Sequence, residues 1–377
     1  MYDIEEINDF ADLAGKKAQW TALLHQTAGS SFFHSLDWLE VFWRHYGMER
    51  KLRALFVSRD GALVGILPLV VQRERRKVGE VRILTYPLND WGSFYSPLGR
   101  QPAETLAAGL AHVCRTRRDW DLIEMRWLQR GGPLAETTER AMRQGGFQAY
   151  ERVRDRTSLI HLPADGDAYY NGLSRNFREK HRRNQRRLNA QGEVVYVSHR
   201  PRGEAWGDCD PRWDLYETCE QIAQKSWQAS SNDGTTLCHD SIRPYLRDAH
   251  AAAARAGALD MHLMYLGGKP LAFTYNYCWR GSVFGCRVGY DAELSKNGVG
   301  NHMTLHAVRH AIERGDTLYD LGPGSLDYKR TFASEVVEIL QFTHYYPLAA
   351  RAQALRFNHC LEQMWPAPAA AAVVEEE

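Results

Sequence analysis

Three residues in the last quarter of the chain have types and spacing that suit group-transfer chemistry. Asp320 ends an apolar stretch and is followed within four residues by two glycines, and Tyr328 and Lys329 come shortly afterwards. A carboxylate at a strand end, beside flexible backbone, is placed to face a cleft and to accept a proton from an amine or a hydroxyl group. The alternative for Asp320 is a structural role, in which its carboxylate caps the loop by accepting backbone N–H groups.

Lys329 and Tyr328 suggest two further roles at the same place. A lysine could stabilise a developing oxyanion or bind a phosphate. A tyrosine could protonate a departing thiolate, because a phenol with a pKa of about 10 suits a thiol leaving group. The alternatives are a solvated lysine and a core aromatic side chain with a hydrated hydroxyl group.

The segment 287–303 shows the pattern strand, loop, helix. Its two glycines lie two residues apart where the helix begins, so that backbone N–H groups and the helix dipole could hold an anion. A plain tight turn fits the same pattern. The absence of G-x-x-x-x-G-K-[ST] excludes a P-loop, and a Rossmann site is disfavoured because the preceding strand ends a hairpin. The candidate anion-binding residues are Asn297, Gly298, Val299, Gly300 and Asn301.

Histidines recur every four residues in the helix that follows, at His302, His306 and His310. This spacing places them on one helix face, opposite an apolar stripe, and we expect that face to be solvated. We predict no metal site, because the sequence fixes no further carboxylate or cysteine ligand beside them. His302, where the loop meets the helix, remains a catalytic candidate.

A basic run covers residues 174–188 and holds seven Lys or Arg residues and one acid. Such a patch binds phosphate-rich partners such as CoA, a nucleotide-sugar, a lipid phosphate or tRNA, and Arg182 and Arg186 are its candidate contacts. A solvated helix anchored by Phe177 and Leu188 is the alternative. The run lacks the aromatic residues of a single-strand nucleic-acid platform.

The elements that must position these residues occur twice along the chain. Each half shows a helix, a glycine-tipped hairpin, a third strand, a second helix and a final strand, which indicates an approximate duplication with a boundary near residues 150–158. In the first half these elements are expected at 35–45, 52–58, 62–71, 81–84, 103–115 and 121–125, and in the second at 244–256, 260–266, 270–277, 281–290, 302–314 and 317–321.

Composition places the chain among ordinary globular proteins. It has 377 residues, 44% of them hydrophobic, and a net charge of +1, which argues against a protein wrapped along a polyanion. No apolar run reaches the roughly 18 residues of a membrane span, and the acidic start of the chain is unlike a signal peptide, so we expect a cytoplasmic protein. The seven cysteines form no C-x-x-C motif and are expected to be reduced.

Several motifs together resemble a known family. The residues 320–329 read D-L-G-x-G-x-x-x-Y-K, and with Gly289-Tyr290-Asp291 and Lys225-Ser226-Trp227 they resemble the BioF2-like or CelD/BcsL-type acetyltransferases. Those proteins belong to the FemAB-like branch of the GNAT superfamily, in which two GNAT domains are fused. The loop at 296–301 resembles the acyl-CoA pyrophosphate loop of GNAT enzymes, with Lys296 or Ser295 where the usual basic or amide residue stands.

The resemblance implies an α/β fold of two tandem GNAT-like domains, each with a mixed, mostly antiparallel twisted sheet flanked by helices. The implied division is an N-terminal domain at 1–155 without a donor site, a donor domain at 156–362 and a flexible tail at 363–377. Acyl-CoA, in the form of acetyl-CoA, is the implied co-substrate. The implied catalytic residues are Asp320, Lys329, Tyr328 and His302, and the implied substrate contacts are Arg182, Arg186, Trp227, Asp90 and Tyr290.

The implied reaction is transfer of an acyl group from acyl-CoA to an amine or hydroxyl acceptor. No G-x-S-x-G or cysteine nucleophile motif occurs, so direct attack on the thioester is expected. The family suggests a small, glycan or lipid-linked acceptor in exopolysaccharide or cell-envelope biosynthesis, and peripheral contact with a membrane synthase. One alternative is a FemAB-like peptidyl transferase that uses aminoacyl-tRNA, and another is a non-catalytic scaffold.

Overall fold

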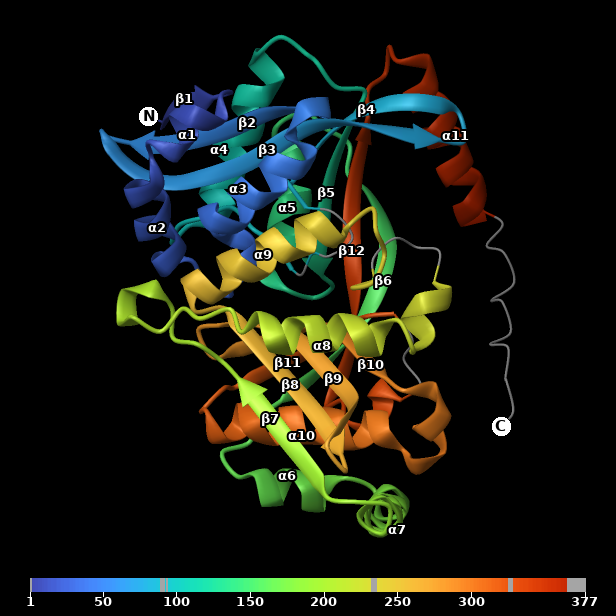
Figure 1. Ribbon diagram of the computed structural model, residues 1–377. Coiled ribbons are helices and arrows are strands. Elements are labelled where there is room, and N and C mark those ends of the chain that lie inside the picture. Colours follow the sequence, from blue (N-terminus) through green and yellow to red (C-terminus); the bar gives the residue numbers. More distant parts are fainter. Residues whose placement is uncertain (1, 89–91, 93, 232–235, 325–327, 365–377) are drawn as a thin grey trace.

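A computed structural model describes residues 2–88, 92, 94–231, 236–324 and 328–364 (Figure 1). Its strands form a twelve-stranded sheet within these residues, in the order β1-β2-β3-β4-β5-β12-β6-β11-β10-β9-β8-β7. The strands are β1 (Tyr2–Ile7), β2 (Arg50–Arg59), β3 (Ala62–Arg76), β4 (Gly79–Thr85), β5 (Leu122–Gln129), β6 (Tyr150–His161), β7 (Val194–His199), β8 (Leu259–Leu266), β9 (Lys269–Trp279), β10 (Ser282–Tyr290), β11 (Leu318–Pro323) and β12 (Glu335–Tyr345).

Helices flank the sheet in both halves of the molecule (Figure 1). The α-helices are α1 (Phe10–Ala14), α2 (Lys17–Gln26), α3 (Leu36–Tyr46), α4 (Pro102–Arg115), α5 (Pro133–Gln144), α6 (Gly166–Gly172), α7 (Arg175–Asn189), α8 (Trp213–Ala223), α9 (Arg243–Ala256), α10 (Val299–Glu313) and α11 (Ala350–Met364). Short 3₁₀ helices are η1 (Phe32–His34), η2 (Gly47–Glu49), η3 (Glu204–Trp206), η4 (Trp227–Ser230), η5 (Ala292–Asn297) and η6 (Lys329–Thr331).

The two halves repeat one arrangement, as the sequence pattern indicates. The β2–β3 hairpin turns at Asp60-Gly61 and the β8–β9 hairpin at Gly267-Gly268, and all four turn residues have positive φ. Two central residues with positive φ match the twist of antiparallel strands, which explains the glycines at both tips. Each half then contains one parallel pair, β4 with β5 and β10 with β11, among otherwise antiparallel neighbours.

The centre of the sheet joins the two halves. Strand β6 pairs with β11 of the second half, whereas β12, late in the chain, pairs with both β6 and β5. Helix α11 follows β12 and lies beside β4, where Arg351 donates a 2.8 Å hydrogen bond to the Glu80 carbonyl. The division predicted at residues 155/156 therefore falls inside a strand that contacts both halves, and it remains a prediction. Of the predicted tail, residues 365–377 lie outside the described residues.

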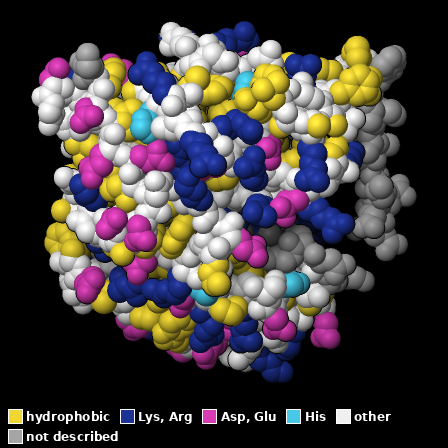
Figure 2. Space-filling view, turned by 90° about the horizontal axis from the view of Figure 1, so that it is seen from above, with side chains coloured by type: hydrophobic (Ala, Val, Ile, Leu, Met, Phe, Trp, Pro, Cys, Tyr) yellow, Lys and Arg dark blue, Asp and Glu magenta, His cyan; other side chains and the backbone are white. Residues whose placement is uncertain are grey.

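A shared apolar core also holds the halves together. The ring of Phe33, from the first half, lies 5.6 Å from that of Tyr277 and 5.2 Å from that of Phe284, which belong to β9 and β10. Helices α3 and α9 pack together, and Asp248 accepts a hydrogen bond from Arg44. Basic and acidic side chains are interspersed on the face shown in Figure 2. None of the described helices is both long and apolar enough to cross a bilayer.

Candidate active site

A cleft opens where the parallel strands β10 and β11 part. They pair only at Ser282–Leu318, Val283–Tyr319 and Phe284–Asp320. Beyond this point the register of β10 with β9 shifts at a bulge, and β11 turns through a glycine at φ 76°. Side chains of β9, β10, β11, α10, η4 and the η6 region line the space between the separated strand ends. Parting of two parallel strands gives an opening whose walls include both side chains and backbone groups.

The close approach of β11 to β10 at this point depends on the absence of a side chain at Gly322. A Cβ atom there would lie 2.5 Å from the carbonyl oxygen of Gly285 on β10, and the residue's φ of 76° disfavours other amino acids. We expect Gly322→Ala to destabilise the protein by at least about 2 kcal/mol, from backbone strain and the clash together.

Gly315→Ala is the matched control for this substitution, because Gly315 has φ 79° and no atom within 4 Å of the added Cβ. It should cost about 1 kcal/mol, the backbone contribution alone. Urea unfolding of both variants measures the difference. Equal losses would show that the close approach of β10 and β11 at Gly322 does not exist in solution.

Lys329 lies at the mouth of this cleft and is only 4% exposed, so the solvated alternative for this lysine is wrong. Its Nζ donates hydrogen bonds to the carbonyl oxygens of Gly322, at 2.8 Å, and Pro323, at 2.9 Å. Burial lowers the pKa of Lys329 to about 8, against the opposing effect of the Asp320 and Asp155 carboxylates. The ammonium group thus remains largely charged at pH 7, with a third N–H beyond the two that bind carbonyls.

Asp320 is buried on β11, on the strand that forms one wall of the cleft. Its Oδ1 accepts a hydrogen bond from the Thr157 hydroxyl of β6 and one from the Gly322 N–H at 2.8 Å. Burial raises the pKa of Asp320 to about 6, although both hydrogen bonds and Lys329 oppose the rise. The bond to Gly322 is the capping contact that the sequence left open as an alternative. The raised pKa gives the carboxylate the basicity of a general base near neutral pH.

Aromatic side chains complete the cleft. Tyr328 precedes Lys329 and is 37% exposed, and burial of its hydroxyl region raises its pKa to about 12. Trp227 in η4 is 48% exposed, and its Nε1 donates a 3.2 Å hydrogen bond to the Val288 carbonyl of β10. Tyr290, at the end of β10, packs beside Gly300 of α10. Of the substrate contacts implied by the resemblance, Trp227 lines the cleft, whereas Asp90 lies outside the described residues.

A second hollow lies between the halves and meets the first at β10 and β11. Aromatic and aliphatic side chains line most of it, including Phe33, Trp127 and Tyr277. Phe284 lines both hollows, whereas Asp320 lines this pocket and not the cleft. Its neighbours Tyr319 and Leu321 line the cleft, as expected for alternating residues of one strand.

The glycine loop forms the N-terminus of α10 but is covered by α7. Gly298 has φ 65° and caps the helix, and the Nδ2 atom of Asn184 lies 2.6 Å from where a Gly298 Cβ would be. Val299 is fully buried, while Asn297, Gly300 and Asn301 are partly exposed. The close approach of Asn184 explains why glycine occurs at 298, and it places a side chain where a bound pyrophosphate would need space.

The histidine face of α10 is not solvated, and this prediction was wrong. His302 is 2% exposed, lies 4.1 Å from the His181 ring of α7, and does not line the cleft. His306 stacks on Tyr196 of β7 at 4.2 Å, and His310 lies 4.9 Å from the ring of His262 on β8. Burial lowers the pKa of each of the three helix histidines to about 4.

The basic run forms the helix α7, which agrees with the alternative of a solvated helix. Phe177 and Leu188 are its buried apolar anchors, as predicted, and Arg182 and Arg186 are exposed. Neither arginine lines the cleft, which brings together Lys329, Tyr328 and Trp227, with Asp320 in the pocket on the other side of β11. All seven cysteines are free, and Cys278 and Cys286 lie on the neighbouring strands β9 and β10.

Sequence reasoning missed five polar residues of the site. Thr157 holds Asp320, and the cleft is lined by Thr274 and Asn276 of β9, Arg287 of β10 and Thr304 of α10. Thr157 lies 163 residues before Asp320 in the chain, and only the pairing of β6 with β11 brings them together. An alternating polar pattern within β9, with Thr274 and Asn276 on one face, was the available signal for Asn276.

The first half contains the corresponding strand pair, in which the carboxylate at the matching position is ion-paired. Glu124 occupies the position on β5 that Asp320 occupies on β11, as the third paired residue of the parallel ladder. Its carboxylate is paired with Arg126 and, at 3.2 Å, with Arg76. The chain after β4 returns to the sheet, where Tyr95 N–H donates to the Trp127 carbonyl at 3.1 Å.

Comparison with known proteins agrees with this arrangement. Residues 175–330 match the family model of the acetyltransferase (GNAT) domain. No curated protein matches the chain at a significant level. Among solved structures, the chain is similar to FemX, with 13% identity and a TM-score of 0.61, over 96% of this chain and 99% of that one.

Two further solved structures have a similar fold. A Bacteroides thetaiotaomicron protein of unknown function is 12% identical, with a TM-score of 0.55, over 91% of this chain and 100% of that one. L-PGS from Bacillus licheniformis is 13% identical, with a TM-score of 0.50, over 91% and 96%. These likenesses concern the fold, and they confirm the predicted α/β architecture of mixed sheet and flanking helices. The family-model match itself covers residues 175–330, less than half of the chain.

Proposed function

We propose that the protein is an acyltransferase whose donor binds in the cleft between β10 and β11. The observation that carries this proposal is the position of two buried, oppositely charged groups, Lys329 and Asp320, where these strands part. The match of residues 175–330 to an acetyltransferase domain supports it. In the first half the corresponding carboxylate, Glu124, is ion-paired with Arg76 and Arg126, so we assign donor binding to the second half.

The proposed reaction is direct attack of an acceptor on the acyl carbonyl carbon. Asp320 takes the proton of the attacking amine or hydroxyl group, and Lys329 stabilises the oxyanion that forms. Collapse of this intermediate breaks the bond to the leaving group, which Tyr328 protonates. Trp227 and Tyr290 would contact the donor along β10, and Tyr290 and Tyr328 are close enough to interact electrostatically.

We propose acyl-CoA as the donor and an acceptor that reaches Asp320 from the pocket between the halves. The thioester would occupy the cleft, and the backbone N–H groups at Gly300 and Asn301 would face the CoA phosphates. His302 would support this loop from within the protein rather than contact substrate, because it is buried against His181. An acceptor in exopolysaccharide or envelope biosynthesis, and membership of the BioF2-like or CelD/BcsL-type group, are part of this proposal.

One observation favours a second donor, aminoacyl-tRNA. Asn184 and the rest of α7 cover Gly298, the residue at which a CoA pyrophosphate loop would be most open. The same helix exposes Arg182 and Arg186, which suits a long phosphate backbone. In this case the attacked bond is the aminoacyl ester, and a ribose hydroxyl is the leaving group.

Titration calorimetry distinguishes the two donors. The native protein is titrated with acetyl-CoA and with a longer acyl-CoA, and in parallel with an aminoacyl-tRNA and the uncharged tRNA. Micromolar binding of an acyl-CoA supports the first proposal. Binding restricted to tRNA, tighter when it is aminoacylated, would replace it by the second. A protein that binds neither class would be a scaffold with this fold.

Charge reversal on α7 gives a further prediction. In the double variant Arg182→Glu, Arg186→Glu, we expect tRNA binding to weaken by about 100-fold at low salt, because two phosphate contacts become repulsive. Acetyl-CoA binding should change by less than about threefold, since neither arginine lines the cleft. Filter binding at two salt concentrations measures the tRNA effect. Arg175→Glu, at the exposed start of α7, is the matched control. A double variant with unchanged affinity for tRNA would remove α7 from the tRNA proposal.

A further inference from the structure

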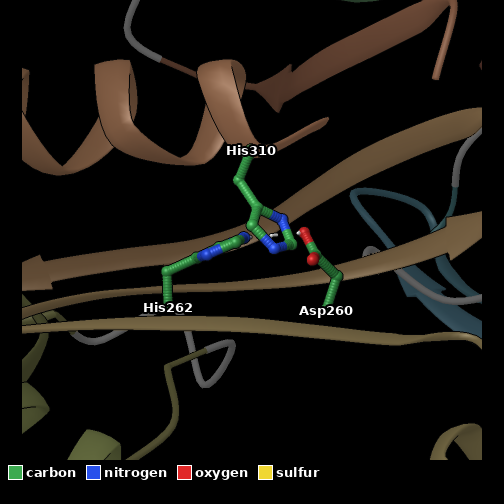
Figure 3. A group of neighbouring side chains, drawn as sticks. All are labelled: Asp260, His262 and His310. Atoms are coloured by element: carbon green, nitrogen blue, oxygen red, sulfur yellow. Dashed lines mark hydrogen bonds and ion pairs between the residues drawn. The ribbon is translucent and has the colours of Figure 1, made fainter. Parts of the chain in front are cut away.

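A cluster of ligand-type side chains lies on the α10-facing side of β8, away from the cleft. Asp260 and His262 stand two residues apart on β8, and His310 reaches them from α10 (Figure 3). One potential ligand atom from each of the three lies within 4.8 Å of the others. Asp260 and His262 are fully buried, and none of the three lines the cleft.

We propose that Asp260, His262 and His310 bind one divalent transition-metal ion, with Zn²⁺ as the best fit. Two imidazoles and one carboxylate form a donor set that suits zinc and leaves a further position for water. The 3.1 Å separation of Asp260 Oδ2 from His262 Nε2 is the spacing of adjacent ligands that are each about 2.1 Å from a single ion.

The environment of His310 is not explained by a hydrogen-bond network alone. Its Nδ1 atom is buried and has no hydrogen-bond partner among the described residues. In Figure 3 the His310 ring hangs from α10 toward the gap between His262 and Asp260. A buried imidazole nitrogen without a partner is costly, and an ion held jointly with the two β8 residues would satisfy it.

Neighbouring groups orient the two β8 ligands by hydrogen bonds, as residues around metal ligands do in known metal sites. Arg200 Nε donates to Asp260 Oδ1 at 2.9 Å, which leaves Oδ2 directed at His262. Ser198 Oγ lies 2.8 Å from His262 Nδ1, so it can accept from that nitrogen and leave the Nε2 lone pair for the ion. Ser198 Oγ also lies 3.0 Å from His306 Nε2, so the serine can donate its hydroxyl hydrogen to that nitrogen.

The surrounding charges can accommodate the ion. Arg200 is a cation close to the site, but Asp316 pairs with its Nη1 at 2.6 Å and offsets it. Counting Asp260, Asp316 and Arg200 with neutral histidines gives a local charge of −1 before the ion binds. The ion would tie β8 to α10, the helix that also forms one wall of the cleft.

Cobalt titration of the full chain tests this site directly. EDTA-treated protein is titrated with Co²⁺, whose visible absorption reports inner coordination by nitrogen and oxygen, and Zn²⁺ is then added in competition. We expect 1:1 binding with micromolar or tighter affinity, displacement by Zn²⁺, and a rise in thermal midpoint on Zn²⁺ addition. A native protein that binds neither ion at 1:1 would overturn the proposal.

The matched variants are His310→Gln and His359→Gln, the second of which changes a buried histidine on α11 that packs against Tyr150. His310→Gln should weaken Co²⁺ binding by at least about 10- to 100-fold, whereas His359→Gln should retain it, with circular dichroism as the check on folding. Equal binding by His310→Gln and the native protein, or an equal loss in both variants, would overturn this ligand set. X-ray absorption of the Zn²⁺-loaded native protein needs no variant. It should show two imidazoles and light-atom ligands, and a sulfur ligand would contradict the assignment.

Discussion

Replacing Lys329 with methionine is expected to lower kcat/KM for acyl transfer by about 100- to 1,000-fold. The ammonium group is the cation that faces the cleft from a buried position, and an oxyanion formed beside it would lose its main charge stabilisation. Methionine keeps the length and the packing of the side chain but removes the N–H donors to the Gly322 and Pro323 carbonyls. The measurement is release of free CoA thiol, or of deacylated tRNA, in the presence of a panel of amine and hydroxyl acceptors.

The control for this variant is Lys269→Met, which removes an exposed lysine at the tip of the β8–β9 hairpin. It should retain the native rate. Circular dichroism and the thermal midpoint separate a lost reaction from a lost fold, because two unpaired carbonyl groups would remain in Lys329→Met. A folded Lys329→Met variant with native kcat/KM would exclude the proposed role of the lysine.

Replacing Asp320 with asparagine is expected to lower kcat/KM by about 100- to 10,000-fold at pH 7.5 and to change the shape of the pH profile. In the native enzyme the carboxylate must be deprotonated to accept a proton, so the rate should rise as the pH passes about 6. Lys329 must be protonated to stabilise an oxyanion, so the rate should fall as the pH passes about 8. The expected profile of kcat/KM is a bell between these values, which belong to the interacting pair.

Each substitution should remove one limb of this bell. Asp320→Asn should abolish the acidic limb, and Lys329→Met should abolish the alkaline limb, each on a much lower rate. Asp155→Asn, an exposed carboxylate near Lys329, is the control and should leave the acidic limb in place. An acidic limb that persists in Asp320→Asn would assign the base to another residue.

Local patterns were sufficient to predict the repeated helices and strands of the two halves, because each is determined by short-range periodicity and turn chemistry. Strands β6 and β12, which join the halves, were not predicted. The hairpins at Asp60-Gly61 and Gly267-Gly268, the helix α7 and the strand–loop–helix around Gly298 all follow from residues close in sequence. The proximity of Lys329 and Asp320 follows from a motif only ten residues long.

What remained unpredicted depends on contacts between distant segments. The pairing of β12 with both β5 and β6, the hydrogen bond from Thr157 to Asp320 and the position of Asn184 over Gly298 join parts of the chain more than one hundred residues apart. The histidine spacing on α10 correctly placed three side chains on one face. It held no information on which elements cover that face, so neither α7 nor the Asp260–His262 pair of β8 was expected there.

Donor binding to a cleft-blocked variant tests the central claim most directly. Val288 lines the cleft from β10 and is partly exposed, so Val288→Trp should fill the space between the parted strands. Val195→Trp adds the same side chain at an exposed site on β7 and serves as the control. We predict that whichever donor the native protein binds, acyl-CoA or aminoacyl-tRNA, calorimetry will show binding to Val195→Trp and at least about a 100-fold loss in Val288→Trp. Equal affinity for that donor in a folded Val288→Trp variant would contradict the placement of acyl transfer in this cleft.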